Sequence, residues 1–200
     1  MSSRSAFFAL VVVFACGSAL AQQGQPGAPS AEEKAMMEAF DRMAKVGDNH
    51  KLLGAMAGEW NTVVRSWMKP GAEPMESKGV SSDRPVMGGR YIQTDFKGDF
   101  MGQPFQGFGM SGYDNVTGKF WSTWSDSMST GVMHVRGTYD AASKPFTYRG
   151  EMPDPMKAGA LVKFRETVKI VDADKHVFEM YETHEGVETK TMEITYTRKK

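Results

Sequence analysis

The stretch VKFRETVKI, residues 162–170, decides the fold class of this 200-residue chain. Its residues alternate strictly, with Val162, Phe164, Glu166, Val168 and Ile170 on one side and Lys163, Arg165, Thr167 and Lys169 on the other. Side chains two positions apart point to the same face of a β-strand, so this period predicts a strand with one apolar and one polar face. Strands of this kind form sheets that are buried on one side only.

The same two-residue period extends from Glu59 to the end of the chain. Short turn signals such as Pro70-Gly71 and Glu185-Gly186 separate the runs. Besides the runs at 59–68 and 162–170, they cover residues 75–83, 91–97, 105–113, 120–128, 132–139, 146–152, 176–184 and 187–198. About ten strands with hairpin-length loops predict an all-β fold, a single antiparallel up-and-down barrel. A β-sandwich is the alternative; the barrel is favoured because closure leaves no exposed edge strand.

The segment before the barrel carries a different pattern. Residues 22–29 are rich in Gln, Gly and Pro and predict a flexible linker. Ser30 and Glu33 form the sequence signature of a capping box, so we expect a helix over residues 30–47. The β-barrel domain then covers residues 50–200.

Residues 1–21 predict a secretory signal peptide. Arg4 supplies the positive charge, an apolar run follows, and Ala19-Leu20-Ala21 gives an A-x-A cleavage signal. We therefore expect an exported protein, either periplasmic or extracellular. A lipoprotein acylated on Cys16 is less favoured, because the bulky Phe14 stands where that signal requires a small residue.

The composition argues against several classes of protein. The chain has 24 basic and 24 acidic residues and a formal net charge of zero. A neutral chain lacks the electrostatic footprint for nucleic acid or an anionic membrane. The only cysteine, Cys16, lies in the predicted leader, so we expect no disulfide and no cysteine metal site in the mature chain. No apolar run is long enough to predict a membrane span.

The first strand opens with LGAMAGEW, residues 53–60. A Gly-x-Trp at the start of the first strand, after a short helical turn, resembles the opening of lipocalin-like (calycin) barrels. The resemblance implies a structural role for Gly58 and Trp60, with Trp60 plugging the closed end of the barrel. It also implies that Arg198, on the last strand, lies over the Trp60 indole.

Longer stretches resemble the DUF1579 family. They are MKPGAEP (68–74), VMGGRYIQTDFKG (86–98), FMGQPFQGFGMSGYDNVTGKF (100–120), STWSDSMSTG (122–131), GTYD (137–140), HVFEMYE (176–182) and MEITYTRK (192–199). The resemblance covers about residues 50–199 and supports the fold and the limits of the domain. The family is named for having no known function, so the resemblance implies no particular chemistry.

Candidate ligand-binding residues gather on one face of the strand at 120–128. Phe120, Trp124, Asp126 and Met128 share that face, which places a carboxylate among bulky apolar groups. Burial of such a carboxylate raises its pKa unless it is paired or hydrogen-bonded. We therefore expect this face to line a pocket, with apolar walls and one acidic anchor.

Two interpretations of Asp126 stay open. It is either a polar anchor for a ligand or part of a buried pair with Arg136 or Arg149. His134 is the second candidate anchor, and Tyr196 is a further wall residue of the expected binding site. Weaker candidates for inward carboxylates are Asp95, Glu166 and Glu179.

Residues 107–112, GFGMSG, match the G-x-G-x-x-G pattern of dinucleotide-binding proteins. That site requires a helix directly after the glycines, whereas here a turn leads into another strand. We interpret the glycines as relief within a strand, which lets the strand coil sharply or lets an aromatic ring from the next strand lie on it.

Metals and cofactors are not part of the favoured interpretation. Met128, Met133 and His134 flank one tight connection, and thioethers with an imidazole would suit copper(I). An inward histidine in the barrel would suit haem. Copper(I) is less favoured, because most methionines stand singly in β runs, where they fill cores or pockets. Haem is less favoured, because a histidine in such a position is more often a surface residue or one whose hydrogen bonds are satisfied within the protein.

The favoured function is non-catalytic binding of a small apolar molecule inside the barrel. One alternative is a barrel enzyme that transfers a proton through an inward carboxylate or histidine. Another is an envelope interaction protein that uses the N-terminal helix or an exposed loop. An unfilled interior favours binding, and an inward Asp or Glu beside His or Tyr in an open cavity favours the enzyme.

Overall fold

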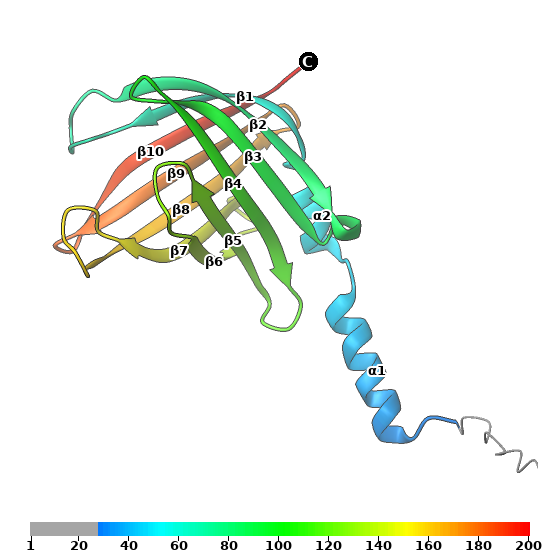
Figure 1. Ribbon diagram of the computed structural model, residues 1–200. Helices are drawn as coiled ribbons and strands as arrows, with labels where there is room; N and C mark the ends of the chain where they lie inside the picture. Colours follow the sequence, from blue (N-terminus) through cyan, green and yellow to red (C-terminus); the bar gives the residue numbers. More distant parts are fainter. Residues whose placement is uncertain (1–27) are drawn as a thin grey trace, which may run out of the picture. The chain divides into compact units, whose positions relative to one another are not determined.

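The computed structural model describes residues 28–200, and in this range ten antiparallel strands close into one barrel (Figure 1). Each strand pairs with its neighbours along the chain, and the last pairs with the first. The strands are β1 (Gly58–Ser66), β2 (Met75–Val86), β3 (Tyr91–Phe100), β4 (Gln103–Asp114), β5 (Lys119–Asp126), β6 (Met133–Tyr139), β7 (Pro145–Pro153), β8 (Leu161–Asp172), β9 (Lys175–His184) and β10 (Val187–Arg198). The predicted all-β, up-and-down barrel is confirmed.

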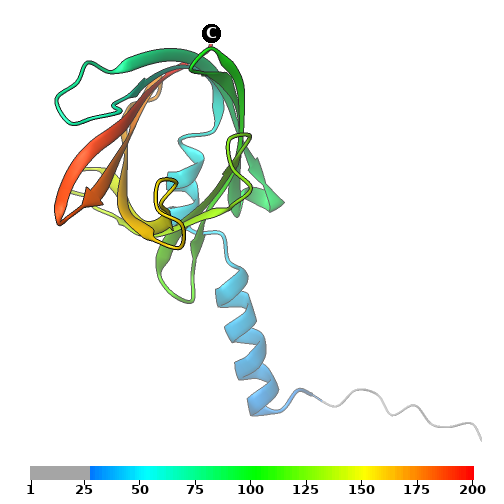
Figure 2. The ribbon, with the colours of Figure 1, turned by 60° about the vertical axis from the view of Figure 1, so that its left-hand side comes forward.

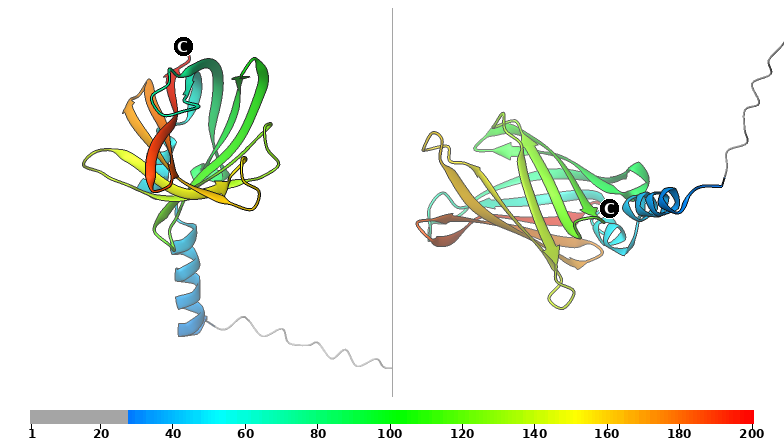
Figure 3. Two further views of the ribbon diagram at one scale, coloured as in Figure 1. Left: turned by 90° about the vertical axis from the view of Figure 1, so that its left-hand side faces the viewer. Right: turned by 90° about the horizontal axis from the view of Figure 1, so that it is seen from below.

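Closure depends on the pairing of β1 with β10, which runs from Trp60 opposite Arg198 to Ser66 opposite Met192. A register shift between Lys190 and Met192 places a bulge in β10, and bulges increase the local bend of a strand. The closed ring, seen from further directions in Figures 2 and 3, leaves no strand of the barrel with an unpaired edge. An exposed edge would be a template for pairing with another chain.

Two helices precede the barrel. α1 (Ala31–Ala44) begins with the expected capping box, in which the Ser30 amide donates to Glu33 Oε2 at 2.6 Å and the Glu33 amide donates to Ser30 Oγ at 3.2 Å. The predicted helix over 30–47 is therefore present and ends at Ala44, and α2 (Asp48–Gly54) follows as a separate helix. The chain divides within α1 into two compact units, Met1–Met37 and Glu38–Lys200, and α2 belongs with the barrel in the second.

The predicted signal peptide, residues 1–21, and most of the predicted linker, residues 22–29, lie outside the described residues. From residue 28 onward, no helix combines the length and the apolar character that crossing a membrane requires.

α2 packs against the end of the barrel where β1 begins. Leu53 of α2 is 1% exposed and joins the main apolar cluster together with Phe120 and Phe146. Figure 2 looks into the barrel from the other end, with α2 lying across the far side. The apolar cluster therefore fills one end of the barrel and leaves the remainder of the interior to other side chains.

The G-x-G-x-x-G stretch lies on β4 and is followed by β5, so no helix stands behind it. The ring of Trp124, on β5, lies against Gly107 and Gly109 of β4. A Cβ atom at Gly107 would come within 2.1 Å of the Trp124 ring. The interpretation of these glycines as a seat for an aromatic ring is confirmed.

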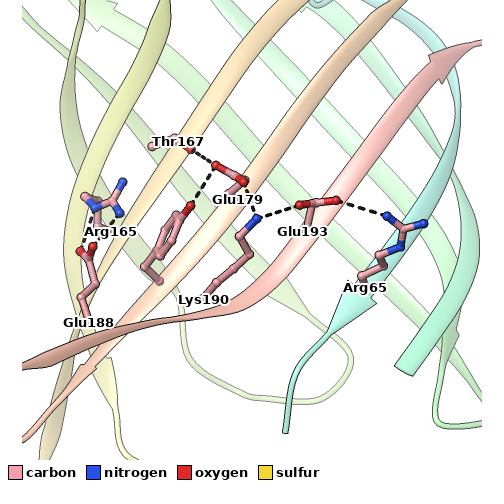
Figure 4. Close-up of polar contacts among 8 residues, drawn as sticks. Arg65, Arg165, Thr167, Glu179, Glu188, Lys190 and Glu193 are labelled. Atoms are coloured by element: carbon pink, nitrogen blue, oxygen red, sulfur yellow. Dashed lines mark hydrogen bonds and ion pairs between the residues drawn. The ribbon is translucent and has the colours of Figure 1, made fainter. Parts of the chain in front are cut away.

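A network of charged side chains crosses the outer face of β8, β9, β10 and β1 (Figure 4). Glu179 accepts hydrogen bonds from Thr167 Oγ1 at 3.2 Å and from Lys190 Nζ. Lys190 also donates to Glu193 at 2.8 Å, and Glu193 contacts Arg65 on β1 at 3.6 Å. These contacts connect four strands across the seam where the barrel closes, and each exposed pair contributes at most about 1 kcal/mol.

Candidate functional site

A cavity of about 390 Å³ lies inside the barrel, and all ten strands contribute side chains to its wall. Most of the wall is apolar. Its larger apolar members include Ile92, Phe96, Trp124, Phe178, Met180 and Met192. Small-molecule sites in proteins have volumes of about 300–1,000 Å³ and apolar walls with a few polar groups. The cavity has the size and the lining of such a site.

The cavity reaches the end of the barrel that is opposite α2. Ser66, Phe100 and Asp126 line it, and they are the last residues of β1, β3 and β5. These three strands run in the same direction, because each antiparallel neighbour reverses the chain. Met128, just beyond β5, lines the cavity and is 58% exposed, so the cavity opens to solvent at this end.

Glu166 on β8 is a half-buried acidic group of the cavity wall. Its register partners on the neighbouring strands are Tyr148 of β7 and Met180 of β9, which also line the cavity. Burial alone raises the pKa of the Glu166 carboxyl from 4.5 to about 7, and among the described residues no group offers it a hydrogen bond. A carboxyl with such a pKa changes its charge near neutral pH.

Asp83 on β2 is a second buried acid, 7% exposed. Burial raises its pKa from 3.8 to about 6, although hydrogen bonds from Thr94 and Ser81 favour the charged form. The Ser81 hydroxyl donates to Asp83 Oδ1 at 2.9 Å. Unlike Glu166, Asp83 therefore has protein partners that hold its carboxylate in place.

His176 on β9 lies between two aromatic rings. Its imidazole stacks on the Tyr196 ring with centroids 4.1 Å apart and meets the Trp60 ring edge-on at 4.4 Å. Burial, together with the charge of Arg198, lowers the pKa of His176 to about 4. The imidazole is therefore neutral at neutral pH and adds no positive charge to the cavity.

The charged residues of the cavity wall are all acidic. Asp83, Asp99, Asp126 and Glu166 line it, whereas no Lys or Arg of the described chain does. Asp99 and Asp126 are hydrogen-bonded near the mouth, to the Gly102 amide at 2.7 Å and to Trp124 Nε1 at 3.0 Å. The interior is therefore apolar with an acidic bias.

The Gly-x-Trp motif has the geometry that the calycin resemblance implies. Trp60 is 1% exposed, and the Arg198 guanidinium lies 4.1 Å from the centroid of its ring. Arg198 also donates to the carbonyl oxygens of Ala57 at 3.0 Å and Ala173 at 2.8 Å. A Cβ at Gly58 would lie 2.1 Å from the Arg198 guanidinium, so only glycine leaves room for this contact.

The structure brings most of the predicted binding residues to the cavity. Trp124, Asp126, Met128 and Tyr196 line it. Phe120 points inward too, but it is buried in the apolar cluster and does not contribute to the cavity wall. Its neighbours there fill the end of the barrel below the cavity.

His134 does not lie in the cavity. Met133 lines the cavity and Val135 is buried, so the alternation of β6 turns His134 and Arg136 to the exposed outer face. His134 is therefore neither an inward anchor nor an inward haem ligand. The same alternation separates it from Met133, so the copper(I) grouping with Met128 does not form.

Asp126 does not pair with Arg136 or Arg149. Its carboxylate accepts hydrogen bonds from Trp124 Nε1 at 3.0 Å and from the Met128 amide at 2.9 Å. Both arginines are exposed on the outer face, where they are register partners. Within residues 28–200, no three His, Asp or Glu side chains gather as metal ligands do.

Asp83 and Glu166 are the acidic groups that sequence reasoning underrated. The sequence marks Glu166 only as a weaker candidate for an inward carboxylate. Its position in the apolar row of residues 162–170 is the signal that it faces the interior. Asp83 was not a candidate. The inward positions of β2 near it are Ser77, Gly79 and Ser81, so no apolar row marked the buried side of that strand.

Fold and site together define a closed, ten-stranded antiparallel barrel that encloses a largely apolar cavity. The chain belongs to a family described as a protein of unknown function (DUF1579), whose model matches residues 45–198. Among curated proteins no match was found. In fold the chain is similar to the crystal structure of Rv2717c from M. tuberculosis, with a TM-score of 0.57 and 14% identity over 78% of this chain and 100% of that one.

Proposed function

We propose that the protein binds a small, largely apolar molecule inside the barrel and releases it unchanged. The observation that carries this proposal is the cavity of about 390 Å³, which has a mostly apolar wall and reaches solvent at one end. Protein interiors are ordinarily packed as densely as organic crystals, so an unfilled cavity of this size in a small barrel indicates a site for a bound molecule. The leader predicted at residues 1–21 adds the proposal that binding occurs after export.

Occupation of the cavity also has a thermodynamic consequence. An unfilled apolar cavity lacks the dispersion contacts that its lining atoms would otherwise make. A ligand that supplies these contacts binds the folded chain and not the unfolded one, so it raises the free energy of unfolding. The proposal therefore predicts that binding and thermal stabilisation appear together.

A substitution that fills the cavity tests the proposal. Ser77 on β2 lines the cavity, and the next residue, Lys78, is exposed on the outer face of the same strand. We expect the uncharged probe N-phenyl-1-naphthylamine to bind the native chain saturably, with enhanced fluorescence. Ser77→Phe should weaken this binding by about tenfold or more, because the new ring takes the space of the probe.

Lys78→Phe is the matched control, since it places the same ring outside the barrel. It should leave the affinity for the probe close to that of the native chain. Equal affinities for the native chain, Ser77→Phe and Lys78→Phe would show that the probe binds elsewhere. Failure of the native chain to bind the probe at all would contradict the proposed function.

A second candidate function is proton transfer on the bound molecule. Glu166, with a pKa raised to about 7 by burial, faces the cavity opposite Tyr148, and perturbed acids in cavities are typical of general acid–base catalysts. Mass spectrometry of small molecules released from the purified native chain and from Glu166→Gln separates the two functions. A compound that the native chain alters and Glu166→Gln leaves unaltered indicates an enzyme, and a compound that neither protein alters indicates a carrier.

A further inference from the structure

The chemistry of the cavity ligand can be narrowed from the charges on the wall. Four carboxylates line the cavity, and no basic side chain of the described residues joins them. An anionic ligand would bring a further negative charge close to these carboxylates, and like charges in an enclosed site are costly. The wall therefore favours a ligand that is positively charged at one end.

Among residues 28–200, Glu166 is the one of these four carboxyl groups that accepts no hydrogen bond. Asp83, Asp99 and Asp126 accept hydrogen bonds, whereas burial is the sole influence on the Glu166 carboxyl. Its carboxylate oxygens face the cavity, so a ligand that displaces water from them must supply a hydrogen-bond donor of its own. Glu166 is thus the natural contact for a donor on the ligand.

Aromatic rings around Glu166 suit a cation. Tyr148 of β7 is its register partner, and Tyr196 of β10 is a second tyrosine of the wall. Both rings line the cavity, as do Trp124 and Phe96. An ammonium group close to the face of an aromatic ring gains about 0.5–2 kcal/mol, and the gain is largest when the group is desolvated.

We propose that the cavity binds an apolar molecule bearing a protonated amine, whose ammonium group donates hydrogen bonds to the Glu166 carboxylate beside the Tyr148 ring. This inference rests on the proposed function and specifies its ligand class. The hydrocarbon part of the molecule lies against Met180, Met192 and the other apolar residues of the wall. A fatty acid of similar size is disfavoured, because its carboxylate would face Glu166.

Three probes with one hydrocarbon frame test this inference: 4-phenylbutylamine, 4-phenylbutan-1-ol and 4-phenylbutanoate. Isothermal titration calorimetry near pH 8 measures each affinity while the amine is protonated and Glu166 is mostly ionised. We expect the native chain to bind the amine about tenfold more tightly than the alcohol, and the carboxylate most weakly. Hydrogen bonds to a charged group account for a difference of this size.

Glu166→Gln should weaken binding of the amine by about tenfold or more and change binding of the alcohol by less than about twofold. The variant removes a buried charge and keeps the shape of the side chain, so we expect it to fold. Glu151→Gln is the matched control, because Glu151 is an exposed outer-face residue of β7. It should leave all three affinities unchanged.

Two results would overturn the inference: the carboxylate binding the native chain as tightly as the amine does, or Glu166→Gln weakening the amine no more than the alcohol. If none of the three compounds binds while N-phenyl-1-naphthylamine does, the amine inference falls and the proposed function stands. If the naphthylamine probe also fails to bind, both fall.

Discussion

At the scale of single residues, Glu166 is the group that sets the character of the cavity. A carboxylate without partners in an enclosed barrel is unfavourable for stability, and a methionine or leucine would pack there at no such cost. The other inward residues of the same strand, Val162, Phe164 and Val168, are apolar. The presence of an acid at this position is therefore better explained by contact with a ligand than by a contribution to folding.

The pH dependence of stability tests the burial of Glu166. Its pKa in the folded chain, about 7, lies above the ordinary 4.5, so the folded state holds the proton more tightly. Its contribution to stability is complete below about pH 4.5 and is lost as the pH rises through about 7. Glu166→Gln should therefore unfold with a higher free energy than the native chain at pH 8, by up to about 3 kcal/mol.

Urea denaturation of both proteins at pH 8 and near pH 4.5 measures this difference. The two free energies of unfolding should be close at the lower pH, because Glu166 is then protonated in the folded state and about half protonated in the unfolded state. A difference of the same size at both pH values would mean that the effect of the substitution is not electrostatic.

At the residue scale, the two-residue period predicted that Trp124, Met128 and Tyr196 face the interior, and all three line the cavity. It failed for His134, because residues 132–135 alternate valine and methionine with one histidine, and either face of that run is plausible until the neighbouring strands are known. Pairing with β5 and β7 decides the face, and that information is not local.

At the scale of elements, the contact between β4 and Trp124 of β5 shapes one wall of the cavity. Gly107 and Gly109 have no side chains, so the Trp124 indole packs directly on the backbone of β4. The indole Nε1 donates a hydrogen bond to Asp126 at 3.0 Å. The pattern of glycines, which superficially suggests a nucleotide site, is a packing device between two strands. Its meaning was predictable, because the sequence places a strand after it.

Gly107→Ala tests this packing. The added Cβ would meet the Trp124 ring at 2.1 Å, so the ring must move away from β4. We expect the free energy of unfolding to fall by about 1–3 kcal/mol, as for other overpacked sites, and the near-ultraviolet circular dichroism of the indole to change. Both are measured on the purified variant by chemical denaturation and spectroscopy.

Gly131→Ala provides the control, since its added Cβ would have no neighbour closer than 4.0 Å. It should leave the stability within about 0.5 kcal/mol of the native chain, as for ordinary surface substitutions. Equal losses at the two positions would indicate a general effect of replacing glycine rather than a clash with Trp124.

At the scale of the whole molecule, the number of strands, their order and their closure were predictable. The turn signals are frequent and regular, and the Gly-x-Trp and Arg198 pair marks the two strands that meet. The cavity was not predictable in the same way. Its existence depends on how far Leu53, Phe120 and the rest of the apolar cluster fill the interior. That depends on the volumes of the side chains, which the two-residue period of the sequence does not reveal.

β2 illustrates the limit of pattern reasoning at this scale. Small and polar residues, Ser77, Gly79 and Ser81, point inward, and Val80 is 43% exposed outside. The strand was recognisable only by its position between two turns. A strand with small side chains inside and an apolar one outside is consistent with an interior that is partly open, because small side chains leave room that large ones would occupy.

The most direct test of the account is nuclear magnetic resonance of the chain with ¹³C-labelled methionine methyl groups. Met180 and Met192 line the cavity, whereas Met87 and Met156 are 70% and 92% exposed. On addition of N-phenyl-1-naphthylamine, we predict shifts and intermolecular nuclear Overhauser effects at Met180 and Met192. Shifts confined to Met87, Met156 or other exposed methionines would place the probe on the surface and contradict a ligand inside the barrel.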